Sequence, residues 1–200
     1  MPREKVILFD TTLRDGQQTQ GVDFSVQDKI NIAQALDDIG IDYIEGGWPG
    51  ANPTDTKFFE KNNHFQNAKF TAFGMTKRAG RSADNDPQLR ALIDSNSDSV
   101  CLVAKTWDFH VDLALGISLD ENIDAIKDSI TSVRSGGKEA MIDCEHFFDG
   151  FKSNPSFSYQ CIQTSIDAGA EWVILCDTNG GTLPNEIYKI VSEVTKRFPG

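Results

Sequence analysis

The sequence lacks the features that mark several large classes of protein. Its 200 residues carry a net charge of −11, and no long basic patch is present, which argues against binding to nucleic acid or to an anionic membrane. No apolar run approaches the roughly 20 residues of a membrane span, and the first residues show no signal peptide. No GxGxxG follows the first apolar run, which argues against a dinucleotide-binding fold.

Cysteine is also scarce. The four cysteines form no CxxC pair, and three of them lie at or near the ends of apolar runs; they are Cys101, Cys144, Cys161 and Cys176. Cysteine in such positions behaves as a small buried apolar residue. We therefore predict free thiols and a cytoplasmic protein, because disulfides are rare in reducing compartments.

Short apolar runs alternate with longer amphipathic stretches along the whole chain. The runs have buried-looking, β-branched centres, which are typical of parallel strands covered on both faces. We expect strands at residues 6–10, 42–47, 69–74, 99–104, 139–144 and 171–177. We expect helices at residues 24–40, 121–137, 154–170 and 183–198. In the first of these, Ser25 and Asp28 form a capping-box-like start.

Six strand–helix units in this order predict an α/β fold of the (β/α)8 TIM-barrel type rather than a doubly wound sheet. A closed barrel needs eight units, so only the first six would be present. We therefore expect residues 1–200 to be the N-terminal part of a TIM-barrel catalytic domain, without strands seven and eight and without a regulatory domain. The first and sixth strands would then have unpaired edges, which favour association with another chain.

Polar and charged residues collect after the expected strands. In a TIM barrel the active site lies at these C-terminal strand ends. The residues concerned are Asp10, Arg14, Asp15 and Gln18 after the first strand, Glu45 in the second, Asp143, Glu145 and His146 around the end of the fifth, and Asp177, Thr178 and Asn179 after the sixth. The opposite strand ends carry plain turns. This asymmetry predicts an enzyme.

The neighbouring Arg14 and Asp15 suggest two complementary roles. A carboxylate is a ligand for a divalent cation. A guanidinium binds a carbonyl or carboxylate oxygen on which negative charge develops. The alternative is an ordinary Arg–Asp pair in a surface loop, and the convergence of Glu45, Glu145 and Asp177 argues against it.

The stretch DTTLRDGQQ, residues 10–18, resembles the signature of the metal-dependent acyl-CoA condensing enzymes and lyases of the TIM-barrel metallolyase group. Residues 21–55 and the stretches HFFDGF and CDTNGGTLP are most similar to the citramalate synthase branch. The resemblance implies an acyltransferase that condenses acetyl-CoA with a 2-oxo acid, pyruvate in this branch, in branched-chain amino acid biosynthesis. It also implies magnesium, manganese or zinc, small-molecule substrates and a homodimer.

The resemblance assigns roles to the first two strand ends. Asp15 would bind the metal. Arg14 would polarise the keto oxygen of the 2-oxo acid and stabilise the alkoxide that forms. Glu45 would orient Arg14 in the substrate-binding pocket, and Gln18 would help to shape that pocket.

The resemblance also assigns roles to the last two strand ends. Glu145 would be the catalytic carboxylate for proton transfer or water activation, and a solvated loop charge is the alternative. Thr178 would bind the substrate carboxylate, and a hydroxyl at a helix entry is the alternative. Lys77, Arg78 and Arg81 follow the third strand and could meet the phosphates of CoA; a solvated loop is the alternative.

Three other functions remain open. A 2-isopropylmalate or homocitrate synthase would differ in its 2-oxo acid. A hydroxymethylglutaryl-CoA-lyase-like enzyme would cleave a carbon–carbon bond with the same metal and Arg14. A non-catalytic fragment or scaffold would fit the absence of an HxH pair, which in this family completes the metal site at the end of strand seven.

The histidine content generates a prediction about the isolated chain. Its three histidines are His64, His110 and His146, and none forms HxH; His146 is better explained as an ordinary strand-end residue than as a substitute ligand. We predict weak binding of divalent metal and no turnover. Isothermal titration with each metal and a CoA-release assay with acetyl-CoA and pyruvate check this. Tight stoichiometric metal binding or measurable CoA release would contradict it.

Overall fold

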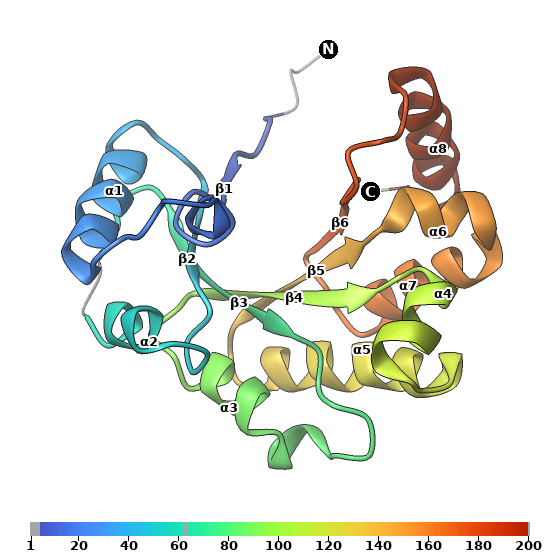
Figure 1. Ribbon diagram of the computed structural model, residues 1–200, viewed down its shortest axis with the longest axis horizontal. Coiled ribbons are helices and arrows are strands. Elements are labelled where there is room, and N and C mark those ends of the chain that lie inside the picture. The colour runs from blue at the N-terminus through green and yellow to red at the C-terminus, as the bar shows by residue number, and fades with distance from the viewer. Residues whose placement is uncertain (1–4, 62–63, 200) are drawn as a thin grey trace.

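The computed structural model describes residues 5–61 and 64–199. Six parallel strands form one sheet in the order of the chain. They are β1 Phe9–Asp10, β2 Tyr43–Gly47, β3 Lys69–Met75, β4 Ser99–Lys105, β5 Glu139–Glu145 and β6 Trp172–Leu175. The sheet curls into an arc with β1 and β6 at its two ends, and the helices lie along its outer side (Figure 1). The predicted partial TIM barrel is confirmed.

Helices follow every strand. The longer connections contain α1 Val26–Asp38, α2 Pro53–Phe59, α3 Pro87–Ile93, α5 Leu119–Ser135, α7 Pro155–Asp167 and α8 Pro184–Arg197. Shorter segments precede two of them: α4 Asp108–His110, which continues into a π-helical turn at Val111–Leu115, and α6 Phe147–Ser153. The four helices expected from the sequence are confirmed to within three residues at each end.

Local sequence signals explain where several helices begin. Ser25 and Asp28 form the predicted capping box, with each side chain accepting the other residue's backbone N–H. A second signal is shared by α2, α3 and α7. In each, a proline occupies the first helical position, and the side chain before it accepts a backbone N–H of the first turn. The capping residues are Asn52, Asp86 and Asn154.

The two edge strands are shorter than the sequence predicts. The first, expected at 6–10, comprises only Phe9–Asp10, and the sixth, expected at 171–177, only Trp172–Leu175. Among the described residues each pairs with a single neighbouring strand. The residues that flank them therefore have no second ladder to hold them extended, and the side chains of Val6, Leu8 and Trp172 remain exposed.

Side chains alternate between the two faces of the curled sheet. The outer face packs against the helices and forms the main apolar core, which includes Ile44, Phe70, Leu102 and Ile142. The concave face carries a smaller apolar cluster of Tyr43, Cys101 and Met141 with Ile7, Phe9 and Ile174. Two residues further along β2, β4 and β5, the same concave face continues toward the carboxyl ends of the strands. The alternation thus brings strand-end side chains to one edge of the arc.

All four cysteines are free thiols, as predicted, and three of them are buried. Of the helices that the structure describes, none is both long enough and apolar enough to cross a bilayer.

Asp37, near the end of α1, ties that helix to the segment before β3. Its buried carboxylate accepts the backbone N–H groups of Gln66, Asn67 and Ala68, each at 2.8 Å. Burial acts to raise the pKa of this carboxyl, but the three hydrogen bonds outweigh it and lower the pKa below its ordinary 3.8.

We predict that Asp37→Asn lowers the free energy of unfolding by about 2 kcal/mol at neutral pH, because hydrogen bonds to charged groups contribute about 1.5–3 kcal/mol. Since the folded-state pKa is lowered, this contribution is present above the ordinary pKa and is lost as the pH falls through the folded-state value. Urea unfolding of both proteins at about pH 7 and about pH 3 measures it. An equal difference at both pH values would contradict the prediction.

Candidate active site

The loop after β1 holds Arg14 at the concave edge of the sheet. The carbonyl oxygen of Thr11 accepts the backbone N–H groups of Arg14, Asp15 and Gly16 at 3.1, 2.8 and 3.1 Å. These bonds close a tight turn at the carboxyl end of the strand. Leu13, one residue before Arg14, is buried in the outer core. The turn is therefore anchored on one side while Arg14 is presented on the other.

Arg14 and Glu45 form a buried ion pair. Arg14 Nε donates to Glu45 Oε2 at 2.7 Å, and the side chain of Glu45 has 0% exposure. Burial raises the pKa of Glu45 to about 7, although the charge and hydrogen bond of Arg14 oppose this rise. Burial acts to lower the pKa of Arg14, but Glu45 outweighs it and the pKa is raised. The guanidinium carbon lies 3.8 Å from the ring centroid of Phe73, whose face favours a cation.

A single pocket of about 530 Å³ collects the residues that the sequence singled out. Five of them line it directly: Arg14, Asp15, Gln18, Glu145 and Thr178. The sixth, Glu45, is buried against Arg14. The remaining walls are Phe9, Thr11, Phe73, Val103, Asp143, Ile174 and Cys176. The structure thus brings all six predicted residues together, and the individual role of each remains a prediction.

Glu145, the last residue of β5, forms an ion pair with Lys105, the last residue of β4. The two residues are register partners on adjacent parallel strands. Asn122 supports this strand end, since its side-chain amide donates to the carbonyl oxygen of Lys105 at 2.9 Å. The sequence analysis gave Lys105 no role of its own. The signal available was its place at the end of an apolar run whose neighbour ends in Glu145.

Thr178 reaches back to β5. Its hydroxyl oxygen accepts the backbone N–H of His146 at 2.8 Å, so its own hydrogen is available for another acceptor. His146 adopts a left-handed backbone conformation with φ of 53°. Its ring centroid lies 4.4 Å from that of His110, and His146 does not line the 530 Å³ pocket.

The sequence matches the family described as HMGL-like over residues 5–199. The chain belongs to the HMGL-like family. It is 51% identical to an (R)-citramalate synthase of Aquifex aeolicus over 98% of the chain and 37% of the relative, and 34% identical to a 2-isopropylmalate synthase of Listeria innocua over the same shares. The chain therefore spans about 37% of the length of the curated relatives it matches. The resemblance found in the sequence is confirmed.

A solved structure supports the fold alone. An HMG-CoA lyase from Brucella melitensis superimposes with a TM-score of 0.78 at 16% identity, over 98% of this chain and 70% of that one. At 16% sequence identity, this structural similarity supports the barrel architecture but gives no information about the reaction.

Dependence on a divalent metal is typical of HMGL-like proteins. Asp15 fits the part of an oxygen ligand, because its side chain is 63% exposed and, among the described residues, its carboxylate is bonded by Arg14 Nη1 alone, at 3.2 Å. Within residues 5–61 and 64–199, no group of three closely spaced ligand atoms includes Asp15. The described residues therefore offer a metal at Asp15 an incomplete set of protein ligands.

A different cluster on the concave face has closely spaced ligand atoms. The side chains of Glu45, Cys101 and Asp143 place one such atom each within 4.8 Å of one another. Burial raises the pKa of Asp143 and raises that of the Cys101 thiol well above its ordinary value, which favours their neutral forms. A cation here would also compete with the guanidinium of Arg14 for Glu45. The role of Asp15 as a metal ligand stays a prediction.

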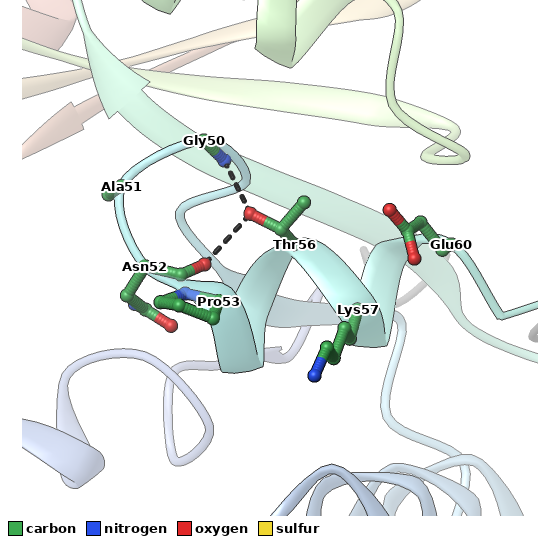
Figure 2. Close-up of a pocket in the computed structure, with 7 residues that line it drawn as sticks. All are labelled: Gly50, Ala51, Asn52, Pro53, Thr56, Lys57 and Glu60. Atoms are coloured by element: carbon green, nitrogen blue, oxygen red, sulfur yellow. Dashed lines mark hydrogen bonds between the residues drawn. The ribbon is translucent and has the colours of Figure 1, made fainter.

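A separate hollow of about 400 Å³ lies at the start of α2. Figure 2 shows that its polar groups bond one another: the Thr56 hydroxyl accepts the N–H of Gly50 at 3.1 Å and donates to the carbonyl of Asn52 at 2.8 Å. None of the predicted site residues lines this hollow. It is not the candidate active site.

The Arg14–Glu45 pair generates a prediction about pH dependence. We expect Glu45→Gln to lower kcat/KM by about 10- to 100-fold, because Arg14 loses the charge that holds it in place. In the wild type, Glu45 becomes protonated as the pH falls through about 7, so kcat/KM should decrease below that pH. The variant has no carboxyl group at this position and should not show this decrease. Rate profiles of the complete gene product between about pH 5.5 and 8.5 measure both effects. Superimposable profiles would contradict the prediction.

Proposed function

We propose that this chain carries the residues that condense acetyl-CoA with pyruvate to citramalate. The observation that supports the proposal is the Arg14–Glu45 pair beside Asp15, Glu145 and Thr178 in one pocket. The choice of substrates is supported by five (R)-citramalate synthases that are 44–51% identical to this chain.

Pyruvate binds through its three oxygen atoms in this proposal. Nε of Arg14 is engaged by Glu45 and Nη1 lies 3.2 Å from Asp15 Oδ1, so the guanidinium would donate to the keto oxygen from its outer nitrogen, Nη2. The hydroxyl hydrogen of Thr178 donates to the carboxylate. Asp15 would hold a divalent cation, which would supply Lewis acidity to the bound 2-oxo acid. The guanidinium stays charged at any relevant pH and stabilises the negative charge that develops on the keto oxygen.

Glu145 removes a proton from the methyl group of acetyl-CoA. The methyl carbon then bonds to the keto carbon, and the electron pair of the carbon–oxygen π bond moves to the oxygen beside Arg14, which then takes up the proton held by Glu145. Water hydrolyses the thioester and releases CoA. Lys105 holds the carboxylate of Glu145 in place through their ion pair.

The apolar walls select a small 2-oxo acid. Phe9, Val103 and Ile174 line the same pocket as Arg14, and they face the place where the methyl group of pyruvate would lie. Each additional methylene on the substrate changes discrimination by only about 1–3 kcal/mol. A preference for pyruvate over a branched 2-oxo acid is therefore expected to be moderate.

A neighbouring cleft suits the long arm of acetyl-CoA. It has a volume of about 460 Å³ and is lined by Trp48, Lys77 and Arg78 among others. Trp48 packs edge-on against Phe73, with ring centroids 5.9 Å apart, and Phe73 lies beneath the Arg14 guanidinium. The cleft thus adjoins the pocket, and its two basic side chains are suited to phosphate groups.

We also propose that residues 1–200 are the N-terminal part of the TIM-barrel domain. The exposed apolar residues Val6 and Trp172 beside β1 and in β6 support two further strand–helix units as the elements that cover these edges.

A substrate panel tests the proposed function. We predict that the complete gene product with Mg²⁺ or Mn²⁺ releases CoA from acetyl-CoA fastest with pyruvate, and that Arg14→Lys lowers this rate by at least about 100-fold, because a lysine cannot present the planar fork. CoA release and mass spectrometry of the product measure both. Faster reaction with 2-oxoisovalerate or 2-oxoglutarate, or cleavage of a hydroxyacyl-CoA instead of condensation, would contradict the proposal.

A further inference from the structure

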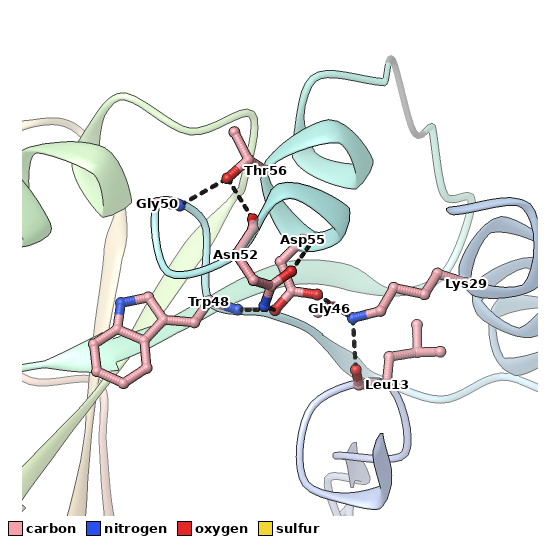
Figure 3. A network of polar contacts seen from close by, with 8 residues as sticks. All are labelled: Leu13, Lys29, Gly46, Trp48, Gly50, Asn52, Asp55 and Thr56. Carbon is pink, nitrogen blue, oxygen red and sulfur yellow. Dashed lines mark hydrogen bonds and ion pairs between the residues drawn. The ribbon is translucent and has the colours of Figure 1, made fainter. Parts of the chain in front are cut away.

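Lys29 is a fully buried lysine in the first turn of α1. Its side chain has 0% exposure, and its Nζ donates to the carbonyl oxygen of Leu13 at 2.8 Å and to that of Gly46 at 3.0 Å. The third bond goes to the carboxylate of Asp55. Figure 3 shows this ammonium at the meeting point of three separate segments of the chain. All three N–H donors of the lysine are therefore used.

Asp55 completes the network from α2. Its second oxygen, Oδ2, accepts the backbone N–H of Trp48 and the side-chain amide of Asn52, both at 2.9 Å (Figure 3). Its own backbone N–H is capped by Asn52 Oδ1 at 2.8 Å. The carboxylate is therefore fixed from both sides, and it fixes Lys29 in turn.

The two glycines after Glu45 make room for this network. Gly47 has a φ of 140°, and a Cβ atom there would lie 2.5 Å from the carboxyl carbon of Asp55. A Cβ atom on Gly46 would lie 2.4 Å from the ring of Phe70. A side chain at position 47 would displace the Asp55 carboxylate, and one at position 46 would displace the ring of Phe70 or the end of β2.

The two carbonyl groups that Lys29 holds belong to the neighbours of the central ion pair. Leu13 directly precedes Arg14, and Gly46 directly follows Glu45. One ammonium group thus binds the backbone of the β1 loop and the backbone of β2 at the positions next to both charges. The distance between the two segments is set at this point.

Stability alone is a weak explanation for a buried ammonium. Burial lowers the pKa of Lys29, and Asp55 acts against this. Apolar side chains of similar volume often replace a buried ion pair at no loss of stability. The benefit of this network therefore lies in what it positions.

We propose that Lys29, held by Asp55, is a positioning residue that sets the geometry of the Arg14–Glu45 pair by tethering the carbonyl groups of Leu13 and Gly46. The proposal rests on the proposed function for its kinetic consequences but not for its structural ones. Lys29 touches no substrate and acts only through its neighbours.

The test separates tethering from stability. Lys29→Met removes the tether and leaves the Asp55 carboxylate buried without a cation, whereas Lys29→Met/Asp55→Asn removes both charges and keeps an acceptor and a donor at residue 55. The matched control is Lys138→Met. Lys138 also donates from Nζ to two backbone carbonyls, those of Ser95 and Ser97. It directly precedes β5 and therefore lies at the amino-terminal ends of the strands, away from the pocket.

The complete gene product serves for all variants. We expect Lys29→Met to have a lower melting temperature and a lower turnover than the wild type. The double variant should recover most of the melting temperature, whereas its kcat/KM for pyruvate should remain about 10- to 100-fold below that of the wild type. KM for acetyl-CoA should change by less than about threefold, because loss of the tether acts on the Arg14–Glu45 pair and not on the cleft proposed for acetyl-CoA. Lys138→Met should lower the melting temperature and leave kcat unchanged. Recovery of kcat together with the melting temperature in the double variant would overturn the proposal.

A crystal structure of the double variant gives a readout that does not depend on catalysis. We expect the Arg14 Nε to Glu45 Oε2 distance to exceed the 2.7 Å of the wild type; an unchanged distance would overturn the proposal even if the enzyme proved to have another substrate. If the double variant does not fold, Lys29→Gln, whose amide keeps a single donor near the carbonyls, replaces it. Turnover equal to the wild type in folded Lys29→Gln would also overturn the proposal.

Discussion

The ion pair between Arg14 and Glu45 is the constraint on which the rest of the site depends. Glu45 lies in the interior strand β2 with no exposed surface, and among the described residues its Oε1 has no hydrogen-bond partner. A carboxylate buried without a cation would carry a large desolvation cost. The guanidinium is therefore held at this point, against the face of Phe73. Its remaining donors are thereby fixed at the head of the pocket without any contribution from a substrate.

The fold supports this pair from the outer side of the sheet. Leu13 is buried among the helices while Arg14, the next residue, lines the pocket. The end of β2 is confined by close packing at Gly46 and Gly47. Lys29 then joins the two segments through their carbonyl groups. The geometry of the pocket is in this way set by packing and hydrogen bonds on the helical side of the sheet.

The sequence predicts the residues of the pocket because parallel strands end at a common edge. Arg14, Asp15, Glu145 and Thr178 each follow or end an apolar run, and the sheet brings them together. The burial of Lys29 was beyond prediction, since a lysine between Asp28 and Ile30 in an amphipathic helix is expected to face water. Its partners come from segments 16, 17 and 26 residues away. The sequence also predicted β1 and β6 to be longer than they are. A pattern of apolar residues does not show whether a strand has a second neighbouring strand to pair with.

The charges around the pocket explain why a site of this kind depends on a cation. Two basic side chains face four carboxyl groups there, namely Arg14 and Lys105 against Asp15, Glu45, Asp143 and Glu145. Burial raises the pKa of Glu45 and Asp143, which reduces the negative excess without making the pocket positive. The proposed 2-oxo acid would bring a further negative charge, and repulsion in a partly buried site is only weakly screened. A divalent cation held by Asp15, as proposed, would offset this negative excess and so would favour binding of an anionic substrate.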